Sequence, residues 1–173
     1  MNRNLIFGAA AALLVSAAAP AAAASINDAQ IAHIAYTAGQ IDIAAGQQAL
    51  ARSHDAKVRA FAQEMVRDHK AVNVQALALV KKLGVTPQAN PTSASLSSAA
   101  AAKLKALARL RGRAFDRAYV QNEVAYHRTV NGALKTTLIP NAQNGELKSL
   151  LQTGLTLFTE HQAHAEHVAA ELH

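Results

Sequence analysis

The 173-residue chain contains no cysteine, and it has only four prolines. The absence of cysteine excludes disulfide bonds, thiolate metal ligands and thiol catalysis, so the fold depends on packing alone. No segment shows the alternation of apolar and polar residues that is typical of β-strands. Three of the prolines, Pro87, Pro91 and Pro140, fall between the apolar repeats and mark connections. These absences together favour an all-α protein.

The sequence motifs of common enzymes are absent as well. There is no G-x-S-x-G nucleophile elbow, no phosphate-binding loop and no H-E-x-x-H zinc motif. The Glu-x-x-His pair of di-iron bundle proteins is also missing, which argues against ferroxidase or oxygenase chemistry. The sequence therefore favours a protein that is not an enzyme.

Long apolar runs are confined to the N-terminus. Arg3 precedes the apolar stretch Leu5–Val15, and Ala22–Ala24 forms a small-residue cleavage site, a pattern that predicts a signal peptide over residues 1–24. The apolar run is too short for a membrane-spanning helix. We expect residues 25–173 to form one exported domain of 149 residues, located in the bacterial periplasm. An uncleaved membrane anchor is the alternative.

Acidic residues are scarce relative to basic ones. Without Arg3 of the signal peptide, 16 Lys and Arg residues stand against 11 Asp and Glu residues. Export and the lack of interleaved aromatic residues argue against nucleic acid as a partner. One stretch, here called the basic segment, contains a single acidic residue, Asp116. It is either a solvated helix face or a contact for an anionic envelope surface. Its basic residues are Lys103, Lys105, Arg109, Arg111, Arg113 and Arg117.

Alanine and leucine abound after the signal peptide, and apolar residues recur every three or four positions, as in amphipathic helices. The row of inward-facing residues on each helix is here called its seam. In the seam of the second helix, spacings of four and three alternate without a break, which is typical of bundle packing. That seam consists of Val58, Ala62, Met65, His69, Val72, Ala76, Leu79 and Leu83. The predicted helices cover residues 27–52, 55–83, 96–110, 113–137 and 146–172.

The four long helices fall into two hairpins, which are separated by a connection that carries the short helix 96–110. A connection of this length allows the third long helix to start at the opposite end of the bundle from a simple hairpin neighbour. We therefore predict a ferritin-like four-helix bundle with a short extra helix in the crossover. A plain up-down-up-down bundle with an additional helix is the alternative.

Three of the eight histidines occupy seam positions where apolar residues normally stand. His69, His127 and His161 lie on three different helices, and an unpaired buried polar group costs about 1–3 kcal/mol. Asp42 and Glu123 also occupy seams, and Glu123 lies about one helical turn before His127. These five residues predict a metal site suited to a divalent transition ion such as Zn²⁺, Cu²⁺, Ni²⁺ or iron.

The same side chains have a structural alternative, because a seam histidine can bond to a neighbouring carboxylate or carbonyl and fix the register of the bundle. In the metal site, a carboxylate such as Asp68 or Asp116 could orient a ligating imidazole. Further along the last helix, Glu160 and His164 form an i,i+4 pair that could bind a metal at the surface. Histidines near a helix C-terminus also complement the helix dipole.

The chain resembles the bacterial family called domain of unknown function 4142 over nearly all of residues 28–172. The most specific part of the resemblance is the segment 58–69. It contains Phe-Ala-Gln at 61–63, Met-Val at 65–66 and Asp-His at 68–69, as members of the family do. Weaker matches are residues 41–46, 114–120 with His127, and 160–161. The family usually has Glu where this chain has Asp42. The resemblance implies an exported protein with a ferritin-like helical bundle, and it implies no established activity.

Two hypotheses about function follow from the sequence. The first is a periplasmic binding or stress-related protein whose bundle core holds a polar site for a metal ion or small ligand. The second is a structural or interaction protein that contacts anionic envelope components through the basic segment.

Overall fold

The computed structural model describes residues 26–172, and the predicted signal peptide, residues 1–24, lies outside them. The elements are α1 (Asp28–Arg52), α2 (Ala56–Lys82), α3 (Pro91–Leu107), α4 (Gly112–Ala133), the π-helical turn η1 (Leu134–Leu138), α5 (Ile139–Asn141) and α6 (Gly145–Glu171). The all-α prediction is confirmed. Within the described residues, no helix combines the length and the apolar character that a membrane crossing requires.

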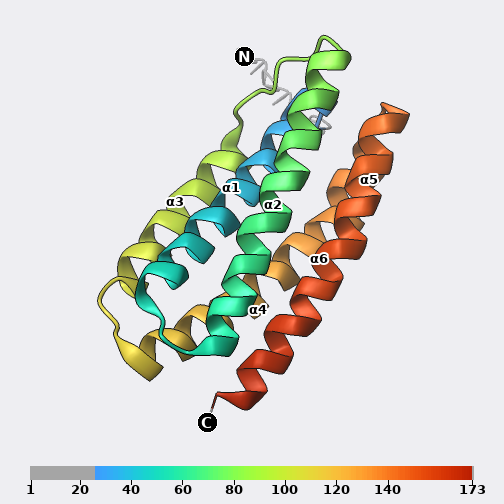
Figure 1. Ribbon diagram of the computed structural model, residues 1–173. Helices are drawn as coiled ribbons and strands as arrows, with labels where there is room; N and C mark the ends of the chain where they lie inside the picture. Colours follow the sequence, from blue (N-terminus) through green and yellow to red (C-terminus); the bar gives the residue numbers. More distant parts are fainter. Residues whose placement is uncertain (1–25, 173) are drawn as a thin grey trace, which may run out of the picture.

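Four long helices pack along one another, and α3 lies against the outside of α1 (Figure 1). α1 and α2 form one hairpin, and α4 and α6 form the other. Between them α3 runs back to the end of the bundle where α2 begins, so that α4 starts there and runs in the same direction as α2 (Figure 1). This path contains the crossover that the ferritin-like prediction requires. It excludes the up-down-up-down alternative, in which α2 and α4 would be antiparallel.

Local sequence signals explain where the long helices begin. Asn27 caps α1 and forms a capping box with Gln30, while Asp55 and Asn144 accept hydrogen bonds from the first backbone N–H groups of α2 and α6. Each cap satisfies donors that have no partner within the helix. The predicted starts of these three helices agree with the structure to within a residue.

The start of α3 was predicted incorrectly. The helix begins at Pro91 and ends at Leu107, whereas the composition of the connection predicted residues 96–110. Asn90 and Ser93 form a capping box, and Pro91 occupies the first turn. Proline favours this position, because its missing N–H needs no partner there and its fixed φ suits a helix. The polar residues before Leu96 are therefore a helix start.

The end of the third long helix was also predicted incorrectly. The helical path does not stop at Thr137 but continues through η1 and α5 to Asn141. In η1 the N–H of Ile139 donates to the carbonyl of Leu134, five residues earlier, which widens the backbone. Pro140 follows this wide turn and lies in the first turn of α5. The helical path therefore continues through Pro140 for a short turn.

The bundle core has three layers. One apolar cluster, around Phe61, Phe115 and Tyr119, fills the end near the α1–α2 turn. A second, around Ile31, Leu138 and Leu151, fills the end near the α4–α6 connection. The five buried residues of the predicted site lie between these clusters.

Candidate metal centre

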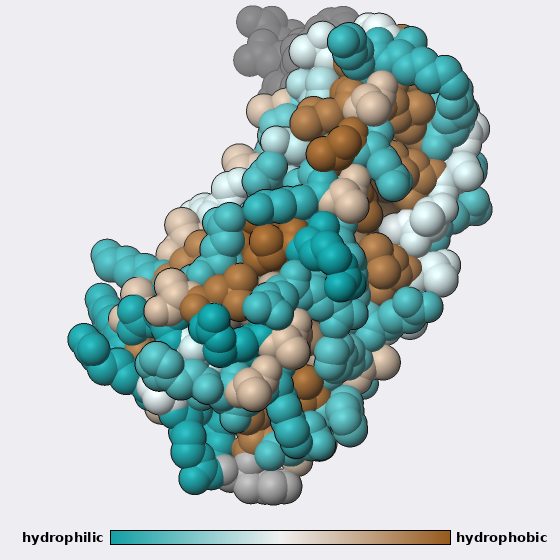
Figure 2. All heavy atoms as spheres, viewed as in Figure 1, coloured by the Kyte–Doolittle hydropathy of each residue, from teal (hydrophilic) through white to brown (hydrophobic). Residues whose placement is uncertain are grey.

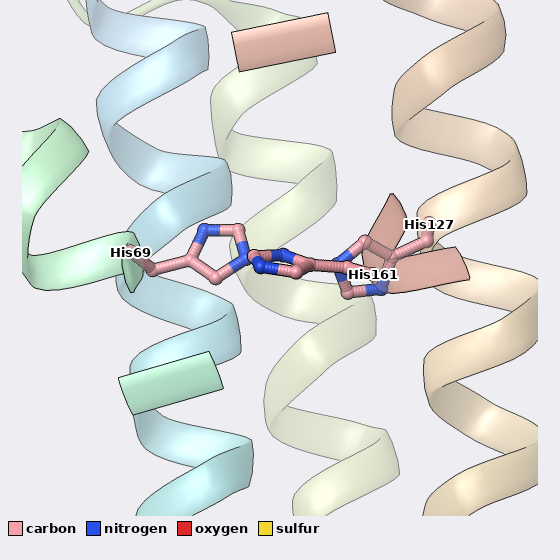
Figure 3. Close-up of side chains that lie close together, drawn as sticks. All are labelled: His69, His127 and His161. Atoms are coloured by element: carbon pink, nitrogen blue, oxygen red, sulfur yellow. The ribbon is translucent and has the colours of Figure 1, made fainter. Parts of the chain in front are cut away.

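The three seam histidines meet inside the bundle. His69 on α2, His127 on α4 and His161 on α6 are at most 2% exposed. Their ring centroids lie 5.7 Å, 5.3 Å and 5.6 Å apart in the three pairs, and the rings point toward one another (Figure 3). One nitrogen of each ring lies within 4.8 Å of a nitrogen of both others. We call this group the histidine triad.

Hydrogen bonds at the periphery orient two rings of the triad. His161 Nε2 donates to Asp68 Oδ2 at 3.1 Å, and Asp68 accepts two further hydrogen bonds from Arg67. His127 Nδ1 donates to the backbone carbonyl of Glu123 at 3.0 Å. Each bond fixes the proton on one nitrogen and leaves a lone pair on the other, as is typical of metal-binding histidines. His127 Nε2 and His161 Nδ1 have no hydrogen-bond partner among the described residues.

His69 is oriented by packing. Its ring stacks on Phe158 with a centroid distance of 4.6 Å and an angle of 14° between the planes. Neither ring nitrogen has a hydrogen-bond partner within residues 26–172, although Nε2 lies 3.4 Å from Asp42 Oδ2. An apolar wall on one side and unpaired nitrogens on the other leave His69 able to bind a cation in the interior.

Two carboxyl groups extend the site. Asp42 on α1 and Glu123 on α4 each offer an oxygen within 4.8 Å of the other and of a His127 nitrogen. Burial, followed by the charge of Glu123, holds the pKa of Asp42 well above its usual range. Burial also raises the pKa of Glu123 to about 7. The pair therefore retains a proton near neutral pH, and a cation between the two groups would displace it.

The imidazoles are shifted in the opposite direction. Burial lowers the pKa of His69 to about 2 and that of His127 to about 4, and it also lowers the pKa of His161. The charged form of each ring is disfavoured because it would lose its hydration without gaining a sufficient counter-charge. All three rings are therefore neutral at pH 7, which is the form that binds metal ions.

A second acidic group lies on the α2 side of the triad. Glu64 and Asp68 offer oxygens within 4.8 Å of a His161 nitrogen, and both are only partly buried. His164 Nδ1 lies 2.6 Å from Glu64 Oε2. The partner of His164 is therefore on α2, and no hydrogen bond joins it to Glu160 in the described part of the chain. Glu64 escaped the sequence analysis because it lies outside the seam, although its i,i+4 spacing from Asp68 was a usable signal.

The structure brings all five predicted site residues into one buried region. Asp68 is confirmed as the carboxylate that orients an imidazole. The alternative, Asp116, is wrong, because this buried residue lies near the other end of α4 and bonds to no imidazole in the described part of the chain.

Comparisons with known proteins agree with this fold. The model of the family described as domain of unknown function (DUF4142) matches residues 13–168. Among solved structures, the chain is similar to a protein of Streptomyces coelicolor described as a secreted DUF305 protein. The TM-score is 0.71 at 16% identity, and 84% of this chain and 93% of that chain are covered. A likeness at this identity shows the helical fold alone. No curated protein matches the chain. Because the family model spans most of the sequence, the chain belongs to the DUF4142 family.

Proposed function

We propose that this protein is exported and that its bundle core binds one divalent transition-metal ion. The observation that supports this proposal best is the set of unpaired nitrogens in the histidine triad. At least one nitrogen of His69, of His127 and of His161 is buried without a partner among the described residues, and one nitrogen of each ring lies within 4.8 Å of a nitrogen of both other rings. Each unpaired buried group costs about 1–3 kcal/mol, which a shared ion would recover.

The donor set indicates the class of metal. Three neutral imidazoles with neighbouring carboxylates suit Zn²⁺, Cu²⁺, Ni²⁺ or Fe²⁺ better than Ca²⁺ or Mg²⁺, which prefer oxygen ligands. Ligands of a tetrahedral ion lie about 3.3 Å apart when each metal–nitrogen bond is 2.0–2.1 Å. Movements of the three rings toward one another would therefore close the site. The carboxylate nearest to His69 is that of Asp42, whose Oδ2 lies 3.4 Å from His69 Nε2.

Burial favours a binding role over catalysis. The triad rings are at most 2% exposed, and apolar clusters lie on both sides of them along the bundle. Such a site holds an ion away from solvent and offers a substrate little access. The predicted signal peptide, together with the structural neighbour described as secreted, supports export, with the periplasm as the proposed location.

The test is metal titration by calorimetry on chelator-treated protein prepared without a histidine tag, combined with elemental analysis of the untreated protein. We expect the wild type to bind one ion per chain and His69→Ala to bind none at micromolar concentrations. His54→Ala is the matched control, because His54 is exposed and lies outside the triad. A wild type that takes up no transition metal, or a His69→Ala variant that binds like the control, would refute the proposal.

The basic segment supports a second candidate function, contact with an anionic envelope surface. Its six basic side chains are all exposed around the α3–α4 turn, whereas its one acidic residue, Asp116, is 5% exposed. The basic segment is therefore positive at the surface and has no exposed acidic residue of its own. Sedimentation with vesicles containing an anionic lipid tests this function. We expect binding that falls with salt and is lost when Lys103, Lys105 and Arg109 become Gln, and salt-independent behaviour would contradict it.

A further inference from the structure

The histidine triad needs a route by which an ion reaches it, because its rings are at most 2% exposed. His127 bonds to the backbone carbonyl of Glu123, and His69 Nε2 lies near the buried Asp42. His161 instead bonds through Nε2 to Asp68, whose side chain is 16% exposed. Among the described residues, His161 is therefore the triad member that a hydrogen bond joins to a solvent-accessible side chain.

Three side chains, here called the outer group, lie on the solvent side of His161. Glu64 and Asp68 are one helical turn apart on α2, and His164 is one turn beyond His161 on α6. Oxygens of Glu64 and Asp68 lie within 4.8 Å of a His161 nitrogen. Glu64 Oε2 lies 2.6 Å from His164 Nδ1, and the His164 ring packs edge-on against Phe61 with a centroid distance of 5.2 Å. The group therefore has a fixed arrangement of two carboxylates and an imidazole.

The outer group is open to solvent. The side chains of Glu64 and His164 are 28% and 39% exposed. The group belongs to the first half of α2 and the second half of α6, which lie in the lower half of Figure 1, and Figure 2 shows mainly hydrophilic residues (teal) at the surface there. Carboxylates and imidazoles are both ligands of divalent transition ions. An ion can therefore bind here directly from water.

His161 is placed to serve the outer group and the triad in turn. Its Nε2 faces Asp68, and its Nδ1 is buried without a partner among the described residues. A neutral imidazole has one lone pair, so it binds an ion through one nitrogen while the other carries the proton. An ion at the outer group takes the lone pair of Nε2. When the ion moves to Nδ1, the ring proton passes to Nε2 by exchange with solvent and again bonds to Asp68.

We propose that Glu64, Asp68 and His164 form an outer site that binds a divalent transition-metal ion from solvent and delivers it to the triad through His161. This proposal rests on metal binding by the triad. Glu64 and His164 are not ligands of an ion in the triad, so they affect the rates of uptake and release and not the final affinity. Arg67 covers this entrance, since its guanidinium bonds to both oxygens of Asp68, at 2.6 Å and 2.9 Å.

The test is stopped-flow absorption with Co²⁺, whose visible spectrum changes when imidazole nitrogens replace its water ligands, on protein without a histidine tag. We expect Glu64→Gln combined with His164→Ala to slow uptake and release about tenfold each, with Kd unchanged. The matched control is Glu160→Gln combined with His167→Ala, which removes the same two groups from exposed positions of α6. The control should keep the rates of the wild type, because long-range attraction of the cation changes equally in both variants.

A variant with the opposite effect gives a second readout. We expect Arg67→Gln to take up Co²⁺ about threefold faster than Arg128→Gln, in which an arginine of similar exposure is removed from α4. If the first double variant does not fold, this comparison decides alone, and equal rates would overturn the proposal.

The proposal would also be overturned if the first double variant bound Co²⁺ at the rate of its control. Slower uptake with a proportionally weaker Kd would overturn it as well, by showing that Glu64 and His164 support the loaded triad. Both results leave metal binding by the triad intact. A wild type that binds no Co²⁺ would overturn the metal site itself, and the outer site with it.

Discussion

Two opposite pKa shifts operate within one buried layer. The pKa values of the triad imidazoles are lowered, because burial disfavours the charged forms of the rings. The neighbouring carboxyls, Asp42 and Glu123, are protonated at unusually high pH for the same reason. The layer as a whole thus avoids net charge in the absence of a cation. A divalent ion would reverse this preference at the carboxyls and coordinate imidazoles that are already in the required form.

The cost of the triad can be measured in the metal-free protein. His69 contributes two unpaired buried nitrogens, so we expect His69→Leu to raise the free energy of unfolding by about 1 kcal/mol when metal is absent. The same change should remove metal binding and any metal-dependent rise in melting temperature. Urea denaturation with and without chelator gives both quantities. Two results together would identify His69 as a structural residue instead. The variant would lose about 1–3 kcal/mol of stability when measured with chelator, and without chelator it would bind as much metal as the wild type.

The shift at Glu123 gives a pH prediction. The folded-state pKa is about 7, whereas an unfolded chain has a value of about 4.3. A group whose pKa is raised by folding contributes its full stability at pH values below its pKa in the unfolded chain. That contribution is lost as the pH rises through its pKa in the folded protein. The quantity to measure is the free energy of unfolding of Glu123→Gln minus that of the metal-free wild type. We expect this difference to be about 2–4 kcal/mol more favourable to the variant at pH 8 than at pH 4. The exposed Glu160→Gln is the control, and a Glu123→Gln difference that does not change with pH would contradict the assigned burial.

At the scale of single helices, the close approach of α1 to α2 depends on Gly39. A Cβ atom added there would overlap the side-chain amide of Asn73, whereas one added at Gly132 in α4 would meet nothing within 4 Å. Both glycines are helical, so alanine gains about 1 kcal/mol of helix propensity at each position. The steric consequence alone therefore distinguishes the two sites.

We expect Gly132→Ala to raise the free energy of unfolding by about 0.5–1 kcal/mol. Gly39→Ala should lower it by about 1–3 kcal/mol, the usual cost of overpacking a core. Thermal or urea denaturation measures both, and adding Asn73→Ala to Gly39→Ala should restore most of the loss. If Gly39→Ala is as stabilising as Gly132→Ala, the two helices are farther apart than described here.

The helix elements illustrate what sequence patterns specify and what they miss. Seam spacing and capping residues located α1, α2 and α6, because those signals are local. Residues 91–95 were misassigned because serine and threonine are common in both loops and first helical turns, and only Asn90 with Ser93 revealed the cap. The π-helical turn before Pro140 was not predicted from the sequence, which had placed the end of the helix at Thr137.

For the whole molecule, the sequence predicted the fold class, the crossover and the five inward-facing residues of the candidate site. It could not predict their convergence, because the axial level of each helix depends on the connections and on core packing. The partners from other helices, such as Asp68 for His161 and Glu64 for His164, follow from that packing as well.

Metal binding by the histidine triad can be tested by X-ray absorption spectroscopy of zinc-loaded protein. We expect one Zn²⁺ per chain with three imidazole nitrogens at about 2.0–2.1 Å and an oxygen as the remaining ligand. In His127→Ala the imidazole contribution should fall and the bound zinc should be lost on dialysis, while His54→Ala should match the wild type. Zinc coordinated mainly by oxygen, or a spectrum that His127→Ala leaves unchanged, would show that the triad is not the metal site.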